Sequence, residues 1–339
     1  MAHQNNQNEL LLAWKALSGS SATDGWRMIN IDADISCRAR AARHFPGNQE
    51  VLLLGFNDIK KISNHSFPKG KGFSLDYADL GANSEGLTWI SLTRELIGSL
   101  DLFSKMSEDI LSVLEKIKGS VQQTIFTIIL ARINAWQDFM KRNKEGVLSS
   151  EEEVGLFGEL LILRELTKYN ILPSQAIDCW QGPLDSIQDF YLNTGALEVK
   201  TTISKNGFDA SINSLEQLDN TLVSPLYLIG VKLSLGEVGI SLSNLIEEIK
   251  KEWVEDAEAI EKFNIKLLHA GYFEELSKEY KRTFLKNEII TFIIDEQFPK
   301  ITKPTLHKEI TKVKYTIDLD LIDTNKIDFN LAISKLREN

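Results

Sequence analysis

The fold of this chain is decided by two strand-like runs, Ser186-Ile187-Gln188-Asp189-Phe190-Tyr191-Leu192 and Ala196-Leu197-Glu198-Val199-Lys200-Thr201-Thr202-Ile203. The connection Asn193-Thr194-Gly195 consists of turn residues and is short enough to predict a β-hairpin. Side chains alternate along a strand, so Glu198 and Lys200 share one face of the second run. A hairpin would bring Asp189 opposite or diagonal to Glu198. The register stays open at this stage, because a one-residue change in the loop would turn Asp189 to the other face.

A helix ahead of the hairpin is expected to bring a third carboxylate to the same place. Ser149 or Ser150, with a Glu three residues later, forms a capping-box start for a helix that runs to about residue 169. Glu159 lies in register with the leucines three residues before and four residues after it, which places it on the apolar face. Gly155 and Gly158 beside it predict close packing against another element. The alternative is a Glu at the edge of that face, reaching into water.

Clustered carboxylates next to an amine favour hydrolysis of a phosphodiester. This reaction needs positive charge at the scissile phosphate, an activated water and stabilisation of the departing 3′ oxygen. Asp189, Glu198 and the backbone carbonyl of Val199 are expected to hold Mg²⁺, which prefers oxygen ligands and keeps several waters. Lys200 would orient or deprotonate the attacking water. Glu159 would hold a second ion or a metal-bound water.

The order of elements narrows the fold class. The hairpin follows a capped helix and precedes a short helical pattern at 214–219 and an apolar strand at 225–233. This is the αβββαβ order of the PD-(D/E)XK nuclease core. The chain resembles bacterial PD-(D/E)XK motif proteins, restriction-type endonucleases of phage-defence and restriction-modification gene clusters. The resembling stretches are Glu153-Val154-Gly155-Leu156-Phe157-Gly158-Glu159-Leu160, Trp180-Gln181-Gly182-Pro183, Asp189-Phe190 and Leu197-Glu198-Val199-Lys200-Thr201-Thr202, with weaker likenesses at His269-Ala270-Gly271-Tyr272 and Phe298-Pro299.

The resemblance implies a restriction-endonuclease-like fold of the α/β (α+β) class. It also implies DNA as substrate, Mg²⁺ as cofactor with Mn²⁺ able to substitute, and co-encoded ATPase or methyltransferase partners. The sequence departs from the motif name in one place: Gln188, not a proline, precedes Asp189, and Pro183 lies in the loop before it. Gln217 loosely matches a polar residue that many members carry after the lysine strand, although a solvated Gln is the alternative.

Four segments are expected along the chain. They are a β-rich N-terminal domain at 1–118 that includes strands at 50–56 and 87–92, a connecting helix at 119–148, the nuclease core at 149–240 and an α+β extension at 241–339. The extension is expected to open with a charged helix at 244–263 and a second helix that contains 267–269, and then to return to strands at 288–295 and 312–321.

The net charge of −10 argues against a uniformly basic nucleic-acid surface. Between residues 27 and 71, however, eight basic residues stand against four acidic ones, so a phosphate-contacting surface is one interpretation and solvated side chains on a small domain are the other. The residues expected to contact DNA are Arg38, Arg40, Arg43, Lys69, Lys71, Lys205 and Gln217.

The composition excludes several other classes of protein. The N-terminus is polar and no apolar stretch is long enough to span a bilayer, so we expect a cytoplasmic protein without a membrane partner. Two cysteines cannot build a disulfide framework, and the five histidines lack zinc-ligand spacing.

Other functions stay open at this stage. One is a non-catalytic DNA-binding or scaffold subunit that acts through partner proteins, and another is an enzyme that cuts RNA or chain ends. A single centre cuts one strand, so a double-strand break would require a homodimer or two successive events.

Overall fold

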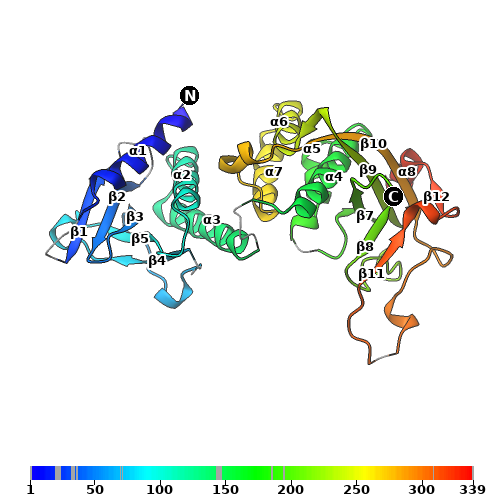
Figure 1. The fold of residues 1–339 in the computed structure, drawn as a ribbon, viewed down its shortest axis with the longest axis horizontal. Coiled ribbons are helices and arrows are strands. Elements are labelled where there is room, and N and C mark those ends of the chain that lie inside the picture. The colour runs from blue at the N-terminus through cyan, green and yellow to red at the C-terminus, as the bar shows by residue number, and fades with distance from the viewer. Residues whose placement is uncertain are drawn as a thin grey trace. The chain divides into compact units, whose positions relative to one another are not determined.

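The computed structural model describes residues 2–337 except for 20–23, 32–34, 36, 69, 71, 143–146, 185, 194 and 308. The chain divides into two compact units (Figure 1). Unit 1 comprises Met1–Val147 with Glu274–Leu276, and unit 2 comprises Leu148–Phe273 with Ser277–Asn339. Lys69 and Lys71, both expected at a DNA surface, lie outside the described residues.

Unit 1 contains a five-stranded antiparallel sheet in the order β1-β2-β3-β5-β4. Its strands are β1 (Gly25–Asn30), β2 (Arg38–Phe45), β3 (Gln49–Phe56), β4 (Phe73–Ala78) and β5 (Thr88–Arg94). Its helices are α1 (Ala2–Ala16), α2 (Leu100–Lys116) and α3 (Gln122–Arg142), with short 3-10 turns at Asn64–Ser66 and Gly81–Ser84. The strands expected at 50–56 and 87–92 are thereby confirmed, whereas α2 was not predicted from the sequence.

Buried polar contacts fix the helices of unit 1. The Trp14 indole of α1 donates to the carbonyl oxygen of Val51 at 2.9 Å, which ties α1 to the sheet. Asp109 of α2 is 1% exposed and accepts from Arg132 Nε at 2.6 Å and from the Trp136 indole at 2.7 Å. Because an unpaired buried carboxylate would be costly, these two donors hold α3 against α2.

Unit 2 is organised around a mixed sheet in the order β12-β10-β9-β7-β6, in which β7 runs parallel to β9 and the other pairs are antiparallel. Its strands are β6 (Phe190–Leu192), β7 (Gly195–Thr202), β9 (Leu226–Ser241), β10 (Thr283–Ile293) and β12 (Lys326–Ile327). A separate two-stranded sheet pairs β8 (Asp209–Ile212) with β11 (Tyr315–Asp318). Residues beyond 240, expected as an extension, therefore supply β10 and β12 to the sheet that contains the hairpin.

Five helices of unit 2 are described. They are α4 (Ser150–Thr167), α5 (Pro173–Cys179), α6 (Leu242–Glu252), α7 (Ala257–His269) and α8 (Phe329–Arg337), with 3-10 turns at Gly182–Leu184, Lys303–Thr305 and Leu319–Leu321. A further 3-10 turn, Glu274–Glu279, has its first three residues in unit 1 and the rest in unit 2. Ser149 is the N-cap of α4 and forms the full capping box with Glu152, so one of the two predicted starts is confirmed. No helix among the described residues has the length and apolarity to cross a membrane.

Two helix predictions in unit 2 are wrong. The single helix expected at 244–263 is two helices, because the chain turns after α6 and Asp256 starts α7 by accepting from the Ala259 N–H at 3.0 Å. Residues 214–219, expected as a helical patch, form bends and turns instead. The amide side chain of Gln217 accepts from the Asn213 N–H at 2.7 Å within this segment.

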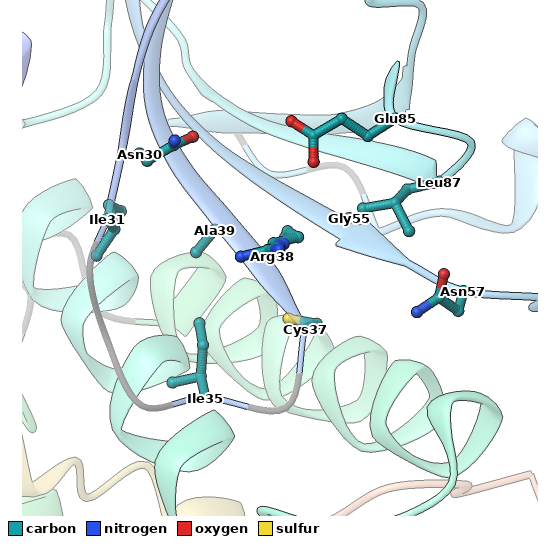
Figure 2. A pocket seen from close by; sticks show the side chains of 10 residues that line it. All are labelled: Asn30, Ile31, Ile35, Cys37, Arg38, Ala39, Gly55, Asn57, Glu85 and Leu87. Atoms are coloured by element: carbon teal, nitrogen blue, oxygen red, sulfur yellow. The ribbon is translucent and has the colours of Figure 1, made fainter. Parts of the chain in front are cut away.

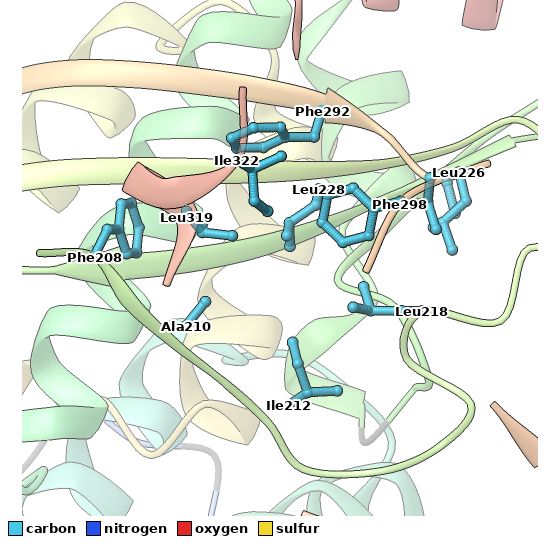
Figure 3. Packing of buried hydrophobic residues seen from close by; sticks show 12 residues of the cluster. Phe208, Ala210, Ile212, Leu218, Leu226, Leu228, Phe292, Phe298, Leu319 and Ile322 are labelled. Carbon is cyan, nitrogen blue, oxygen red and sulfur yellow. The ribbon is translucent and has the colours of Figure 1, made fainter. Parts of the chain in front are cut away.

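The two faces of β7 have different neighbours. Ala196 belongs to a buried apolar cluster on one face of the sheet (Figure 3), to which β8, β9, β10 and the turns around Phe298 and Leu319 also contribute. Thr201, whose side chain alternates to the other face, meets Gly158 of α4, where an added Cβ would lie 2.9 Å from the Thr201 Cβ and closer still to its hydroxyl. The close packing predicted at Gly158 is confirmed, whereas at Gly155 it is wrong, because nothing lies within 4 Å of a Cβ there.

These two glycines give a matched pair of substitutions. Gly158→Ala forces a methyl group into Thr201, and overpacking of this kind costs about 1–3 kcal/mol. Gly155→Ala enters open space and removes a flexible residue from a helix, so it should gain up to about 1 kcal/mol. Urea unfolding should show the midpoint falling in the first variant and not in the second; equal midpoints would contradict this packing.

Candidate active site

The site begins where β6 ends. The β6–β7 ladder pairs Phe190 with Leu197, and the same register continued by one residue places Asp189 opposite Glu198. The Oδ2 atom of Asp189 accepts the Val199 N–H at 2.7 Å. A side chain thus takes the hydrogen-bonding position on the edge of β7 that a longer β6 would have filled. The two carboxylates predicted to converge do so.

Glu198 is the most enclosed member of the cluster, with 1% of its surface exposed. Its Oε1 atom accepts from Lys200 Nζ at 2.7 Å and from Gln217 Nε2 at 2.9 Å. Its Oε2 atom is buried and has no hydrogen-bond partner in the described structure. Burial first, and then the charge of Asp189, raise the pKa of Glu198, whereas Lys200 lowers it; the net result is a pKa of about 8.

Lys200 remains a cation in this arrangement. Burial lowers its pKa, but the charges of Glu198 and Asp189 more than offset burial, and the pKa lies above its ordinary value. Three carboxylates, those of Glu159, Asp189 and Glu198, therefore face one ammonium group. We call these four residues the acidic centre.

Glu159 reaches the acidic centre from α4. Its Oε2 atom accepts from the Trp180 indole N–H at 2.7 Å. Burial, followed by the Asp189 charge, raises its pKa well above the ordinary range, and Asp189 shows an upward shift whose first cause is also burial. A Cβ added at Gly182 would lie 2.7 Å from Glu159 Oε2 and 2.9 Å from Asp189 Oδ1. Two carboxylate oxygens thus converge on a space that only glycine leaves free.

Sequence reasoning missed the support behind Glu159. The Trp180 indole is fully buried, and its N–H orients the Glu159 carboxylate. Lys266 of α7 is 8% exposed, and its Nζ donates to the carbonyl oxygens of Ile177, at 2.7 Å, and of Trp180. The only signal in the sequence was the resemblance at Trp180-Gln181-Gly182-Pro183, since no local pattern connects residue 266 to residue 180.

The residues expected to contact DNA separate into three groups. Gln217 lies inside the site, against Glu198. Arg38 and Lys205 are exposed. Arg40 and Arg43 are 5% and 8% exposed. The prediction that they contact DNA is wrong, because their guanidinium groups are buried and bind partners within unit 1. Their partners include Asn30, Asn83, Glu85, Trp14, Asn48 and Glu50.

A pocket of about 680 Å³ opens in unit 1 (Figure 2). Arg38, Cys37, Asn30 and Asn57 are among its lining residues, together with Glu85. Glu85 pairs with Arg40, so the pocket presents no cluster of carboxylates comparable to the acidic centre. Burial raises the pKa of the Cys37 thiol to about 12, which leaves it a poor nucleophile. The cluster of carboxylates expected from the sequence therefore lies in unit 2.

A family model described as "Putative PD-(D/E)XK family member, (DUF4420)" matches residues 10–320. The chain belongs to this family. The resemblance inferred from the sequence is thereby confirmed, and the mixed α and β architecture agrees with a nuclease-like fold. No curated protein matches the chain, and no solved structure does.

The donors that a PD-(D/E)XK family member would offer a divalent cation are present in the acidic centre. They are the carboxylates of Asp189, Glu198 and Glu159 and the carbonyl of Val199. That carbonyl points to the same edge of β7 as the Val199 N–H, which already meets Asp189. Among the described residues, no group of three or more His, Cys, Asp or Glu side chains is arranged so that it could by itself hold a metal ion. Mg²⁺ keeps several waters and needs only one or two carboxylates, so the unpaired Glu198 Oε2 and the convergence at Gly182 fit such an ion.

The raised pKa of Glu198 predicts how the stability of the metal-free protein changes with pH. The folded protein holds this proton up to about pH 8, whereas the unfolded chain loses it near its ordinary pKa of about 4.3. The stabilisation that protonated Glu198 gives to the folded state is fully present below the pKa of the unfolded chain. It is lost as the pH rises from that pKa to the higher pKa of the folded protein. In the presence of a chelator, the free energy of unfolding of Glu198→Gln should therefore exceed that of wild type by an amount that grows between these two pKa values. Above the pKa of the folded protein this difference should stay constant.

Chemical unfolding at several pH values would measure this gain. The matched control is Glu237→Gln, an exposed carboxyl on β9, which should show no such pH-dependent gain. A constant difference between Glu198→Gln and wild type at every pH would show that Glu198 is not held protonated.

Proposed function

We propose that this PD-(D/E)XK family member is an Mg²⁺-dependent DNA endonuclease, acting in a bacterial restriction or anti-phage defence system. Family membership supports a nuclease-like protein. The resemblance of its motifs to restriction-type endonucleases supports the defence role and co-encoded ATPase or methyltransferase partners. A second copy of the chain, acting on the opposite strand, would make a double-strand break.

One observation carries the proposal: the acidic centre gathers three enclosed carboxyl groups around a single ammonium group, so they cannot all ionise there without a further cation. Glu198 is buried with one oxygen unpaired, and Glu159 and Asp189 converge at Gly182. Burying unpaired carboxylates costs several kcal/mol unless a cation compensates them. A module that only bound DNA as a scaffold would have no physical need for this arrangement.

Each residue then has a defined task. Asp189, Glu198 and the Val199 carbonyl would hold the ion, and Glu159 would hold a second ion or a water. Bound Mg²⁺, for which Mn²⁺ would substitute, supplies positive charge beside the scissile phosphate and makes a water more acidic. Lys200 is already protonated, which favours orienting the attacking water and neutralising the phosphate over removing a proton. The water oxygen bonds to phosphorus as the bond to the 3′ oxygen breaks; the water proton passes to solvent and the 3′ oxygen takes up a proton.

Asp189→Ala should remove both metal binding and cleavage. It takes away one of the two carboxylates expected on the ion and the acceptor of the Val199 N–H. Wild type should nick supercoiled circular DNA in Mg²⁺ and not in chelator, and Mg²⁺ or Mn²⁺ should raise its melting temperature. The variant should do neither. If wild type shows neither effect, the non-catalytic subunit becomes the better explanation.

Lys200→Ala should separate cleavage from metal binding. The substitution removes the ammonium group but leaves every proposed ligand, so nicking should fall by about 10²–10⁴-fold while the metal-induced rise in melting temperature persists. Lys251→Ala, an exposed lysine at the end of α6, is the control and should cleave like wild type. Wild-type cleavage by Lys200→Ala would exclude the role proposed for Lys200.

A further inference from the structure

A basic loop, residues 300–314, runs between β10 and β11. It contains five lysines, at positions 300, 303, 308, 312 and 314, and Glu309 is its single acidic residue. The net charge of this stretch is positive, whereas the net charge of the whole chain is −10. In Figure 1 it extends beyond the sheet next to β8 and β11.

The structure holds the two ends of the basic loop together. The Ile301 N–H donates to the Tyr315 hydroxyl at 3.0 Å, so the loop leaves and returns at nearly the same point. Tyr315 begins β11 and pairs with Ile212 of β8. The described residues between Ile301 and Tyr315 therefore form one loop, whose base is the pair Ile301 and Tyr315.

That base lies beside the acidic centre. Lys300 Nζ donates to the side-chain oxygen of Asn220, and Gln217, three residues earlier in the same turn segment, donates to Glu198. On the other side, burial raises the pKa of Tyr315, and the nearby charge of Lys200 lowers it. Lys300 and Tyr315, at the two ends of the loop, thus lie near the residues that surround Glu198 and Lys200.

The lysines further along the loop are available for an external partner. Lys303, Lys312 and Lys314 are exposed, and no ion pair or hydrogen bond of their side chains is found within the described residues. Arg40 and Arg43 of the N-terminal basic segment, in contrast, are buried against partners of their own unit. These three lysines therefore offer exposed positive charge on the loop whose base lies near the acidic centre.

We propose that the basic loop, through Lys303, Lys312 and Lys314, holds the backbone phosphates of duplex DNA next to the acidic centre. This inference rests on the proposed function, because it assigns the surface that presents the substrate. A polyanion that approaches three carboxylates meets repulsion, and lysines beside the site counter it without reading base sequence. Flexible ammonium groups bind phosphate as point charges, which suits a duplex of any sequence.

The test compares DNA binding by the full chain and by Lys303→Gln/Lys312→Gln/Lys314→Gln. Fluorescence anisotropy of a labelled duplex, in chelator so that no strand is cut, would give Kd over about 50–200 mM salt. Loss of three phosphate contacts should flatten the slope of log Kd against log salt by about two to three and raise Kd at least about tenfold near 100 mM salt. The matched control, Lys251→Gln/Lys278→Gln/Lys326→Gln, removes three exposed lysines elsewhere and should leave both quantities near wild type.

The outcomes separate this inference from the proposed function. If wild type nicks DNA in Mg²⁺ but the loop variant keeps the wild-type Kd and salt slope, the inference is overturned and the nuclease proposal stands. If the loop variant loses binding but wild type never nicks DNA, the surface stands and the catalytic proposal fails. Absence of duplex binding by wild type, or equal loss in both lysine variants, would also overturn the inference. Should the triple variant not fold, each single substitution should flatten the slope by about one.

Discussion

Within the part of the chain that the structure describes, no strand pairs with the outer edge of β7 beyond Leu197, and the carboxylate of Asp189 accepts a backbone N–H there. This follows from the length of β6, which has only three residues. A longer β6 would satisfy the edge with its own carbonyls and would place a strand where the acidic centre now lies. The shortness of one strand thus fixes Asp189 opposite Glu198 and turns the Val199 carbonyl toward the same space.

The parts of the site that could be predicted from the sequence depend on local geometry. Alternation along a strand puts Glu198 and Lys200 together, and a tight turn limits where Asp189 can lie. The start of α4 was predictable to within one residue for the same reason, since a capping box needs only neighbours. The two-unit division and the sheet shared by β7, β10 and β12 were not, because they depend on contacts between residues far apart in the chain.

The errors have specific physical causes. Arg40 looked like a surface cation because it lies between Arg38 and Arg43 in a segment with excess basic residues, but Trp89 and Glu85, more than forty residues later, contact its guanidinium group. The break between α6 and α7 has no Gly or Pro to mark it; only the capping side chain of Asp256 does. Gly155 and Gly158 read alike in a helical pattern, yet only Gly158 meets the sheet. Composition and spacing do not reveal which residues from distant parts of the sequence pack against a given side chain.

Lys266 anchors the Trp180 turn through carbonyl oxygens of the main chain, at Ile177 and at Trp180 itself. Every residue type carries such an oxygen, so exchange of the side chain at position 177 would leave the anchor in place. The residue that orients Glu159 cannot be exchanged in this way, because the hydrogen-bond donor is the side chain of Trp180. The support behind Glu159 therefore depends on the side chains at positions 180 and 266, which no local sequence pattern connects, and not on the side chain at position 177.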